Sequence, residues 1–149
     1  MKWFYKNENG SIKKYSKLKD FPNNTHGFIY RVVNQQSGKF YIGKKVLFHN
    51  VKKLLTKKEI AEWDKPGRVP RKRLITSESD WQTYWGSNKI LKGEIATLGE
   101  DNYTREILQL CYNKKQLTYY ELWWQIQLNV LAIETYNENI LGRFFRRDL

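Results

Sequence analysis

The side chains best suited to chemistry in this sequence are two tyrosines and one glutamate. Tyr30 and Tyr41 stand 11 positions apart in β-prone segments, and Glu121 stands in an apolar stretch with helical periodicity. At about 100° per residue, Glu121 falls about 40° from Leu117 and on the same side as Leu128. A carboxylate on the core side of a helix is costly unless it is paired or binds a metal ion. Both a salt bridge to a lysine and a metal site therefore remain open for Glu121.

A β-hairpin over residues 27–46 would position both tyrosines. Its two β-prone runs flank a turn signal at residues 35–38, although aromatic pairs also occur on strands without any function. Two helices are expected over about 87–98 and 116–133, and Thr118 is a possible cap of the second. A strand is expected over 103–111. We therefore predict the α+β class, with a small antiparallel sheet of about three strands flanked by helices.

Two segments differ from this core. Residues 1–26 are polar and rich in lysine, and we expect them to be an N-terminal extension, either a leader or a short hairpin. A basic insertion at about 46–76 is broken by prolines and glycine, and we expect irregular structure there with one short helix near 56–63. We predict that residues 27–149 form one domain around this insertion, because 149 residues with 40% hydrophobic content suit a single core.

The chain carries a formal charge of +12, and its pI is about 9.7. The expected partner is therefore a polyanion, either nucleic acid or membrane phospholipid. No run approaches the ~20 apolar residues of a membrane span, and no signal-peptide core is present. This favours nucleic acid and an intracellular, cytoplasmic protein without membrane contact. Cys111 is the lone cysteine, so an internal disulfide is excluded, and we interpret it as a buried apolar residue.

The hairpin carries two motifs, Gly27–Tyr30 (Gly-Phe-Ile-Tyr) and Tyr41–Gly43 (Tyr-Ile-Gly), that resemble the paired signature of the GIY-YIG nuclease superfamily. The tyrosine spacing is the one that the family uses, and Phe28 is an insertion in the first motif. The likeness extends from residue 27 to about residue 140. In detail the chain is similar to phage-borne, homing-endonuclease-like members, which share a basic insertion and a Tyr-Trp-Gly-Ser stretch. The resemblance implies an endonuclease that hydrolyses DNA phosphodiester bonds.

This resemblance also implies a metal site. Glu121 would hold a divalent ion, Mg²⁺ (or Mn²⁺), because one carboxylate with several waters and a phosphate oxygen is a typical magnesium arrangement. Asn137 resembles the family asparagine that completes the site by hydrogen bonding near the scissile phosphate. An asparagine at a turn is explained equally well by local structure.

Lys44 matches a family lysine that directly follows the second motif. Together with Lys45 and the metal ion, it is expected to favour phenolate character, since an isolated phenol with a pKa of about 10 is a poor base at neutral pH. On this hypothesis Tyr30 accepts the proton of the attacking water. Tyr41 then orients that water or the phosphate.

The family's arginine has no counterpart at its expected place, where this sequence has Lys52 and Lys53. A guanidinium that engages two phosphate oxygens would be replaced by one of these lysines, or supplied by Arg71 or Arg73 at the end of the basic insertion. We favour Arg73, because the insertion closes there against the polar segment 84–88.

DNA contacts are expected from Lys45, Lys52, Lys53, Arg71, Lys72, Ser87 and Lys89, and also from the C-terminal Arg143, Arg146 and Arg147. One domain offers one active site, so the expected product is a nick in one strand. Cleavage of both strands would need a dimer or a second binding event, and the sequence leaves the oligomeric state open. Two alternatives also stay open, a non-catalytic nucleic-acid-binding module and a ribonuclease.

Overall fold

The structure is a computed structural model that describes residues 2–149. It divides into two compact units, one made of the described residues up to Leu47 with Asp80–Leu149, and the other of Phe48–Ser79. The predicted hairpin is present in the first unit. β3 (Gly27–Asn34) pairs antiparallel with β4 (Phe40–Val46), so that Tyr30 lies opposite Gly43 and Tyr41 lies opposite Val32.

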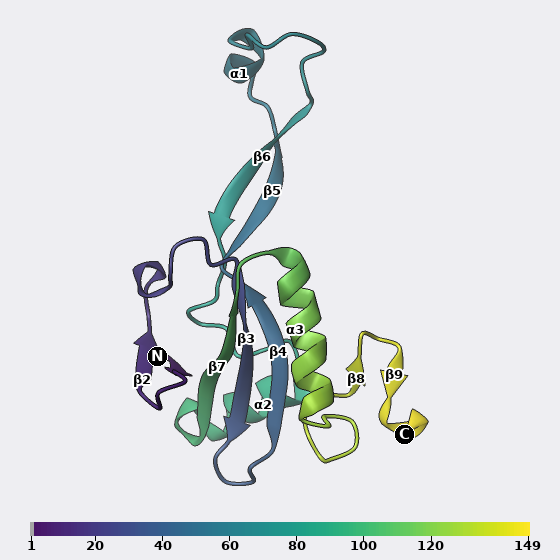
Figure 1. Cartoon of the computed structure of the whole chain (residues 1–149). Helices are drawn as coiled ribbons and strands as arrows, with labels where there is room; N and C mark the ends of the chain where they lie inside the picture. The colour runs from purple at the N-terminus through teal and green to yellow at the C-terminus, as the bar shows by residue number, and fades with distance from the viewer. Residues whose placement is uncertain (1) are drawn as a thin grey trace. The chain divides into compact units, whose positions relative to one another are not determined.

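The first unit is built on a five-stranded sheet with the order β2-β1-β7-β3-β4 (Figure 1). β7 (Tyr103–Cys111) is the predicted third strand and pairs antiparallel with β3. β1 (Trp3–Lys6) and β2 (Ile12–Tyr15) form an N-terminal hairpin, and β1 joins β7 in parallel. The α+β class is confirmed. The sheet is larger than predicted and mixed, because the N-terminal hairpin buries Trp3 and Tyr15 in the core.

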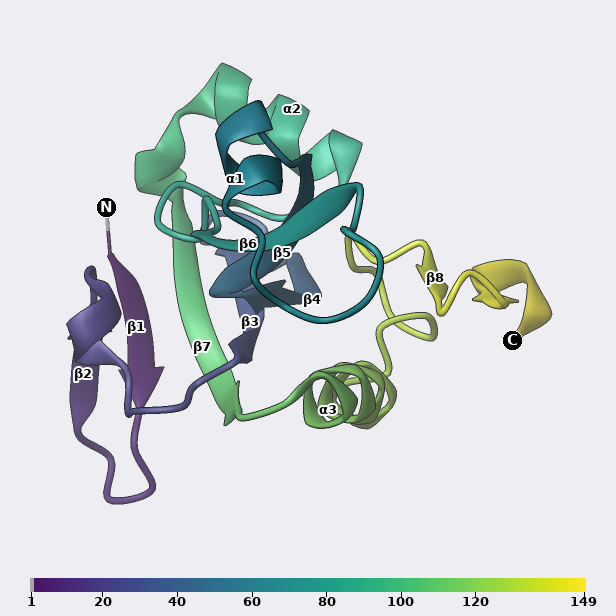
Figure 2. The ribbon, with the colours of Figure 1, turned by 90° about the horizontal axis from the view of Figure 1, so that it is seen from above.

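The two faces of this sheet have different cores. The aromatic core includes Trp3, Phe28, Tyr30, Trp81 and Trp85, and it packs against α2 (Lys89–Leu98) through Leu91 and Ile95. The aliphatic core includes Ile29, Ile42, Cys111 and Leu117, and the last of these comes from α3 (Lys114–Gln127). Figure 2 shows α2 and α3 on opposite sides of the sheet. Cys111 is buried as predicted, and this burial raises the pKa of its thiol to about 11.

The boundaries of α3 differ from the prediction, whereas α2 follows Asn88 and ends before Gly99 as expected. Asn113, not Thr118, caps α3, because its Oδ1 accepts a hydrogen bond of 2.8 Å from Gln116 N. The helix ends at Gln127 instead of residue 133. Asn129 adopts a left-handed φ of 50°, a conformation that asparagine tolerates better than most residues.

The second unit is a two-stranded antiparallel ribbon. β5 (Phe48–Leu54) and β6 (Lys72–Glu78) form seven residue pairs, and α1 (Lys57–Ala61) lies between them in sequence at the predicted place. The prediction of irregular structure was wrong for the two strands. Neither strand shows the alternation of apolar and polar residues by which a half-buried strand is recognised, because nearly every side chain of the ribbon is exposed.

The C-terminal segment folds back beside α3 with a short hairpin of β8 (Asn139–Ile140) and β9 (Phe144–Phe145). Arg146 donates hydrogen bonds to the carbonyl oxygens of Val130 (2.9 Å), Thr135 (3.0 Å) and Asn137 (3.0 Å). Contrary to expectation, its guanidinium is therefore used inside the protein instead of being free for phosphate. No helix within residues 2–149 is long and apolar enough to cross a membrane.

Candidate active site

A polar cavity of about 550 Å³ lies beside the edge strand β4, and we call it the β4-edge cavity. Its walls come from β4, the start of α2, the helix α3 and the segment that follows α3. The lining residues are Tyr41, Ser87, Asn88, Lys89, Glu121, Gln125, Asn137, Glu138, Asn139 and Leu141. Five residues that the sequence predicted for the site thus share one cavity: Tyr41, Ser87, Lys89, Glu121 and Asn137.

Tyr41 presents its hydroxyl to this cavity. The hydroxyl oxygen lies 2.9 Å from Ser87 Oγ, which fixes its orientation. Burial raises the pKa of Tyr41 above its ordinary value, and the hydrogen bond with Ser87 opposes part of that shift. At neutral pH the phenol is therefore protonated and can donate a hydrogen bond.

Tyr30 lies in the core and does not line the cavity. It is 1% exposed, and its ring centroid lies 6.1 Å from that of Tyr41 and 5.9 Å from that of Tyr84. Burial raises the pKa of Tyr30 well above its ordinary value, and both neighbouring tyrosines raise it further. In the protein alone these effects oppose the predicted phenolate character, which stays a prediction because it also invoked a bound metal ion. Lys44 and Lys45 are paired with carboxylates instead.

Two glycines leave room for the tyrosine rings. A Cβ atom on Gly43 would lie 2.7 Å from Tyr30 Cζ and 2.9 Å from Tyr41 Cε1. A Cβ atom on Gly86 would lie 3.3 Å from the Tyr41 ring and 3.4 Å from Tyr30 Oη. At Gly43 a Cβ atom would displace the rings, whereas at Gly86 the contact would only be tight. The glycine of the Tyr-Ile-Gly motif is thus required by the packing of the two tyrosines.

Glu121 reaches the cavity from α3. Its side chain is 18% exposed, and its Oε1 lies 3.3 Å from Lys44 Nζ. Burial raises the pKa of the Glu121 carboxyl, while Lys44 lowers it. Of the two explanations left open by the sequence, the ion pair is present, and the same carboxylate also lines a polar cavity.

The cavity offers hard oxygen donors for a metal ion. Mg²⁺ usually keeps several waters and is held by one or two carboxylates. Glu121 and Glu138 supply two carboxylates to the cavity wall, and the sequence analysis did not single out Glu138. Residues 2–149 contain no group of three or more His, Cys, Asp or Glu side chains arranged to hold a metal ion. This donor set fits a largely hydrated hard cation.

Asn137 is tied to the backbone of β4. It is 3% exposed, its Oδ1 accepts a hydrogen bond of 2.9 Å from Ile42 N, and its Nδ2 donates one of 2.9 Å to Ile42 O. Because β4 is an edge strand, the amide supplies the pairing that another strand would otherwise provide. The amide nitrogen carries a second N–H, so the hydrogen bond near the scissile phosphate that the sequence suggested stays a prediction. The contacts support a positioning role next to Tyr41.

Arg105 supports the site from behind, and the sequence analysis missed it. It is 1% exposed on β7, and its guanidinium carbon lies 4.5 Å from the ring centroids of both Trp3 and Trp85. Its Nη1 donates hydrogen bonds to Gln82 O (3.0 Å) and Tyr84 O (2.8 Å). Burial lowers the pKa of Arg105 to about 10. A single arginine in a strand carries no positional signal, so only the fold identifies it.

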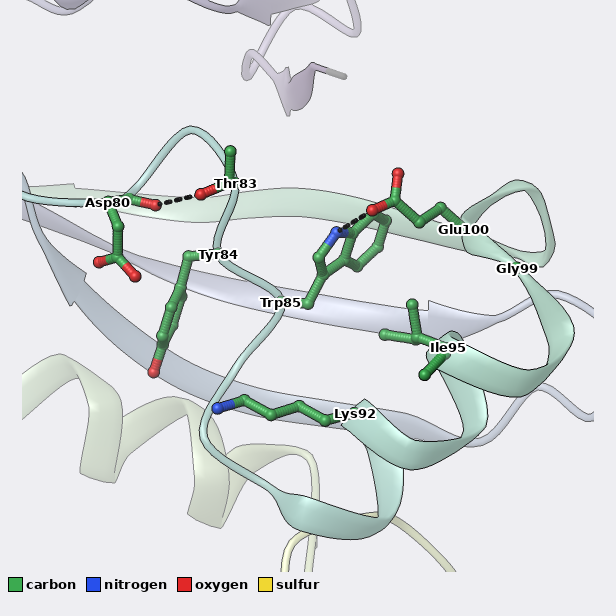
Figure 3. Close-up of a pocket in the computed structure, with 9 residues that line it drawn as sticks. Asp80, Thr83, Tyr84, Trp85, Lys92, Ile95, Gly99 and Glu100 are labelled. Atoms are coloured by element: carbon green, nitrogen blue, oxygen red, sulfur yellow. Dashed lines mark hydrogen bonds between the residues drawn. The ribbon is translucent and has the colours of Figure 1, made fainter.

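A second cavity, of about 470 Å³, lies between the 80–86 segment and α2 (Figure 3). Trp85 Nε1 donates to Glu100 Oε1 (3.2 Å), and Thr83 Oγ1 donates to Asp80 O (3.3 Å), as drawn in Figure 3. These bonds fix the segment that carries Tyr84 against Tyr30. The sequence indicated only that residues 84–88 approach the hairpin, and it assigned no role to Tyr84.

The remaining predicted residues lie elsewhere. Lys45 Nζ contacts Asp80 Oδ1 at 2.5 Å and lies 3.8 Å from the centroid of the Tyr84 ring, so this lysine is engaged within the protein. Lys52, Lys53, Arg71, Lys72 and Arg73 all belong to the Phe48–Ser79 unit. There, Arg73 Nε lies 2.9 Å from Glu59 Oε2. The arginine role that we assigned to Arg73 stays a prediction.

Residues 3–141 match the sequence model of a family described as "Putative endonuclease segE, GIY-YIG domain". The match includes both tyrosine motifs, Glu121 and Asn137. It begins at β1 and so includes residues that the sequence analysis expected to be an extension. No curated protein and no solved structure gives a significant match.

Proposed function

The chain belongs to the SegE GIY-YIG nuclease family. We propose that it is a metal-dependent endonuclease that hydrolyses DNA phosphodiester bonds at the β4-edge cavity. One observation carries the proposal. Tyr41 packs with the aromatic core, Glu121 comes from the helix on the opposite face of the sheet, and both line one polar cavity at the sheet edge. A purely structural Lys44–Glu121 ion pair would not explain the partly exposed phenol in the same cavity.

Glu121 would hold the metal ion, with Glu138 as a second carboxylate of the same cavity. A bound Mg²⁺ or Mn²⁺ ion would polarise a phosphate oxygen and lower the pKa of a bound water. Lys44, 3.3 Å from Glu121, lowers the pKa of that carboxyl against the larger effect of burial and adds positive charge beside the phosphate.

Tyr41 is the phenol that meets the phosphate or its attacking water, since it lines the cavity and Tyr30 does not. Its neutral hydroxyl, oriented by Ser87, donates a hydrogen bond there. Tyr30 has a strongly raised pKa and is a positioning residue beneath Tyr41. In this proposal Tyr41 keeps the orienting role that the sequence analysis gave it, whereas Tyr30 loses the role of the base.

Phosphate contacts come from exposed cationic and polar side chains. Lys89 and Ser87 line the cavity and would bind the backbone of the cleaved strand. Lys52, Lys53, Arg71 and Lys72 would add contacts from the second unit. Arg73 keeps its assigned role as the phosphate-binding arginine, and the substrate would have to displace Glu59 from it.

The first unit contains one β4-edge cavity, so each encounter would cut one strand. The expected product is a nicked circle, and linear DNA would need a dimer or a second binding event. Gel electrophoresis of supercoiled plasmid separates these products directly.

The decisive experiment incubates supercoiled plasmid with Mg²⁺, Mn²⁺ or a chelator, and with wild type, Glu121→Gln, Tyr41→Phe or Tyr30→Phe. Tyr119→Phe is the matched control, because this tyrosine is 61% exposed on α3. We expect nicking by wild type only with metal, no nicking by Glu121→Gln, and a loss of about 10²–10³-fold for Tyr41→Phe. Tyr30→Phe should lose less than Tyr41→Phe, and Tyr119→Phe should match wild type.

Each opposite result removes a defined part of the proposal. Binding without cleavage of plasmid, single-stranded DNA or RNA would identify a non-catalytic binding module. Cleavage of RNA alone would identify a ribonuclease. Rapid cleavage by Glu121→Gln would leave the Lys44–Glu121 pair as structural. A larger loss for Tyr30→Phe than for Tyr41→Phe would restore Tyr30 as the tyrosine that accepts the proton.

A further inference from the structure

The ribbon of the Phe48–Ser79 unit leaves its side chains unusually open. All seven residues of β5 are exposed, and so are five of the seven residues of β6. An isolated two-stranded hairpin is only marginally stable in water, and exposed strand edges invite aggregation. A ribbon of seven residue pairs whose side chains are this exposed is best explained by a binding partner that covers it.

On one face of the ribbon every residue is exposed, and we call this face the open face. From the strand register it consists of four cross-strand pairs: Phe48–Glu78, Asn50–Thr76, Lys52–Leu74 and Leu54–Lys72. Thr76 Oγ1 donates a hydrogen bond of 2.8 Å to Asn50 Oδ1, which orders the amide at the centre of this face. Lys52 and Lys72 form no ion pair within the described residues.

The charge of this unit favours a polyanion. Residues 48–79 contain nine Lys and Arg residues against four Asp and Glu residues, a net charge of +5 out of +12 for the chain. On the face opposite the open face, Lys53 lies directly across from Arg73, whose guanidinium is paired with Glu59. The remaining surplus of positive charge in this unit favours phosphates beside the ribbon.

We propose that the ribbon enters the major groove of duplex DNA and that its open face reads base edges. This inference rests on the proposed function for the choice of DNA. The major groove admits a two-stranded β-ribbon, whereas the deep, narrow major groove of duplex RNA does not. The six steps between seven residues, at about 3.3 Å each, span about 20 Å, or about six base pairs at 3.4 Å per base pair.

The open face carries the side chains that base reading needs. Lysine pairs with the O6 and N7 acceptors of guanine, and asparagine pairs with the N6 and N7 groups of adenine. Asn50 can make the adenine pair without losing Thr76, because an amide oxygen accepts two hydrogen bonds. Leu54 and Leu74, 63% and 60% exposed, match the apolar methyl group of thymine. The sequence analysis expected only phosphate contacts and low specificity from these residues.

The test selects binding sites from a pool of random-sequence DNA duplexes with the Glu121→Gln protein, so that binding is measured without cleavage. We expect an enriched motif of about six base pairs. Adding Asn50→Ala and Lys52→Ala should weaken binding to the enriched duplex about 10–100-fold more than binding to random duplex. The matched control removes two lysines from α1, Lys57→Ala with Lys58→Ala, and should weaken both equally. Duplex RNA of the same length should not compete.

Three results would overturn the proposal. The first is the absence of an enriched motif, and the second is an equal loss of affinity for both duplexes when Asn50 and Lys52 are changed. The third is unchanged DNA binding together with an altered molecular mass in sedimentation, which would make the open face a protein contact. Plasmid cleavage by wild type is scored separately. A motif without cleavage would sink the proposed nuclease function while sparing base reading, and cleavage without a motif would do the reverse.

Discussion

The β4 edge and the ribbon treat exposed strand edges in opposite ways. At β4, the amide of Asn137 pairs with Ile42, and Tyr136 N donates a hydrogen bond of 2.8 Å to Phe40 O. The edge is closed, and the side chains beside it have fixed partners. The ribbon has only its two strands and a surplus of cations. Under the two proposals, the packed edge positions the chemistry and the open ribbon contacts the substrate.

The largest difference in the free energy of unfolding is expected between substitutions at two arginines, Arg105 and Arg73. Arg105→Ala should lower the free energy of unfolding by about 3–5 kcal/mol, because it removes a buried guanidinium stacked on two indoles and leaves a void. Arg73→Ala should lower it by no more than about 1 kcal/mol, since its ion pair with Glu59 is well exposed. Urea unfolding followed by tryptophan fluorescence measures both.

Arg105→Met separates the contribution of packing from that of hydrogen bonding at Arg105. It keeps most of the side-chain volume, and two guanidinium nitrogens of Arg105, Nε and Nη2, have no hydrogen-bond partner within residues 2–149. We expect Arg105→Met to be milder than Arg105→Ala in stability but to slow plasmid cleavage, because the carbonyl groups of Gln82 and Tyr84 lose their donor. Equal stability of Arg105→Ala and Arg73→Ala would break the comparison.

A smaller difference in the free energy of unfolding is expected between substitutions at two asparagines, Asn137 and Asn50. Asn137→Ala should destabilise by about 2–4 kcal/mol, because it leaves the N–H group of Ile42 without its partner and leaves Gln125 as the remaining side-chain donor to the C=O group of Ile42. Asn50→Ala should change stability by less than about 1 kcal/mol, as its single bond to Thr76 is exposed. The same urea titrations apply. A cost for Asn137→Ala no larger than that for Asn50→Ala would mean that the β4 edge is not held by this amide.

The smallest expected effect sharpens the role of Glu121. The raised pKa of Glu121 means that the folded state binds a proton at this carboxyl more readily than the unfolded state does. The contribution of Glu121 to the free energy of unfolding therefore falls as the pH rises from the ordinary pKa of 4.5 through the raised pKa. In chelator, Glu121→Gln should therefore be more stable than wild type at pH 7, and the gap should close toward pH 4. Urea unfolding at pH 4, 5, 6 and 7 measures this gap. A gap that widens toward pH 4 would contradict the shift.

Addition of Mg²⁺ at pH 7 gives the complementary measurement. A ligand that binds only the folded state stabilises it, so wild type should gain stability and Glu121→Gln should not. Equal gains for both proteins would place the metal elsewhere.

Much of the fold was predictable because its signals are local. The hairpin, β7 and α2 were predicted from alternation, a helical stripe, Asn88 as a cap and Gly99 as a stop. The ribbon was missed because its strands bury neither face, so no alternation exists to detect. The N-terminal hairpin was underestimated because its parallel pairing with β7 joins residues about a hundred positions apart.

For the site, the residue types and their spacing already determined which side chains could do chemistry: two tyrosines 11 positions apart and a carboxylate on a helix face that should be buried. Only the tertiary structure decided where each of them lies. The strand order places Tyr30 on the interior strand β3 and Tyr41 on the edge strand β4, while Glu121 reaches the cavity from α3 on the other face. Burial, which shifts each pKa and decides what reaches water, depends on packing between distant segments, and that information is not contained in any local pattern.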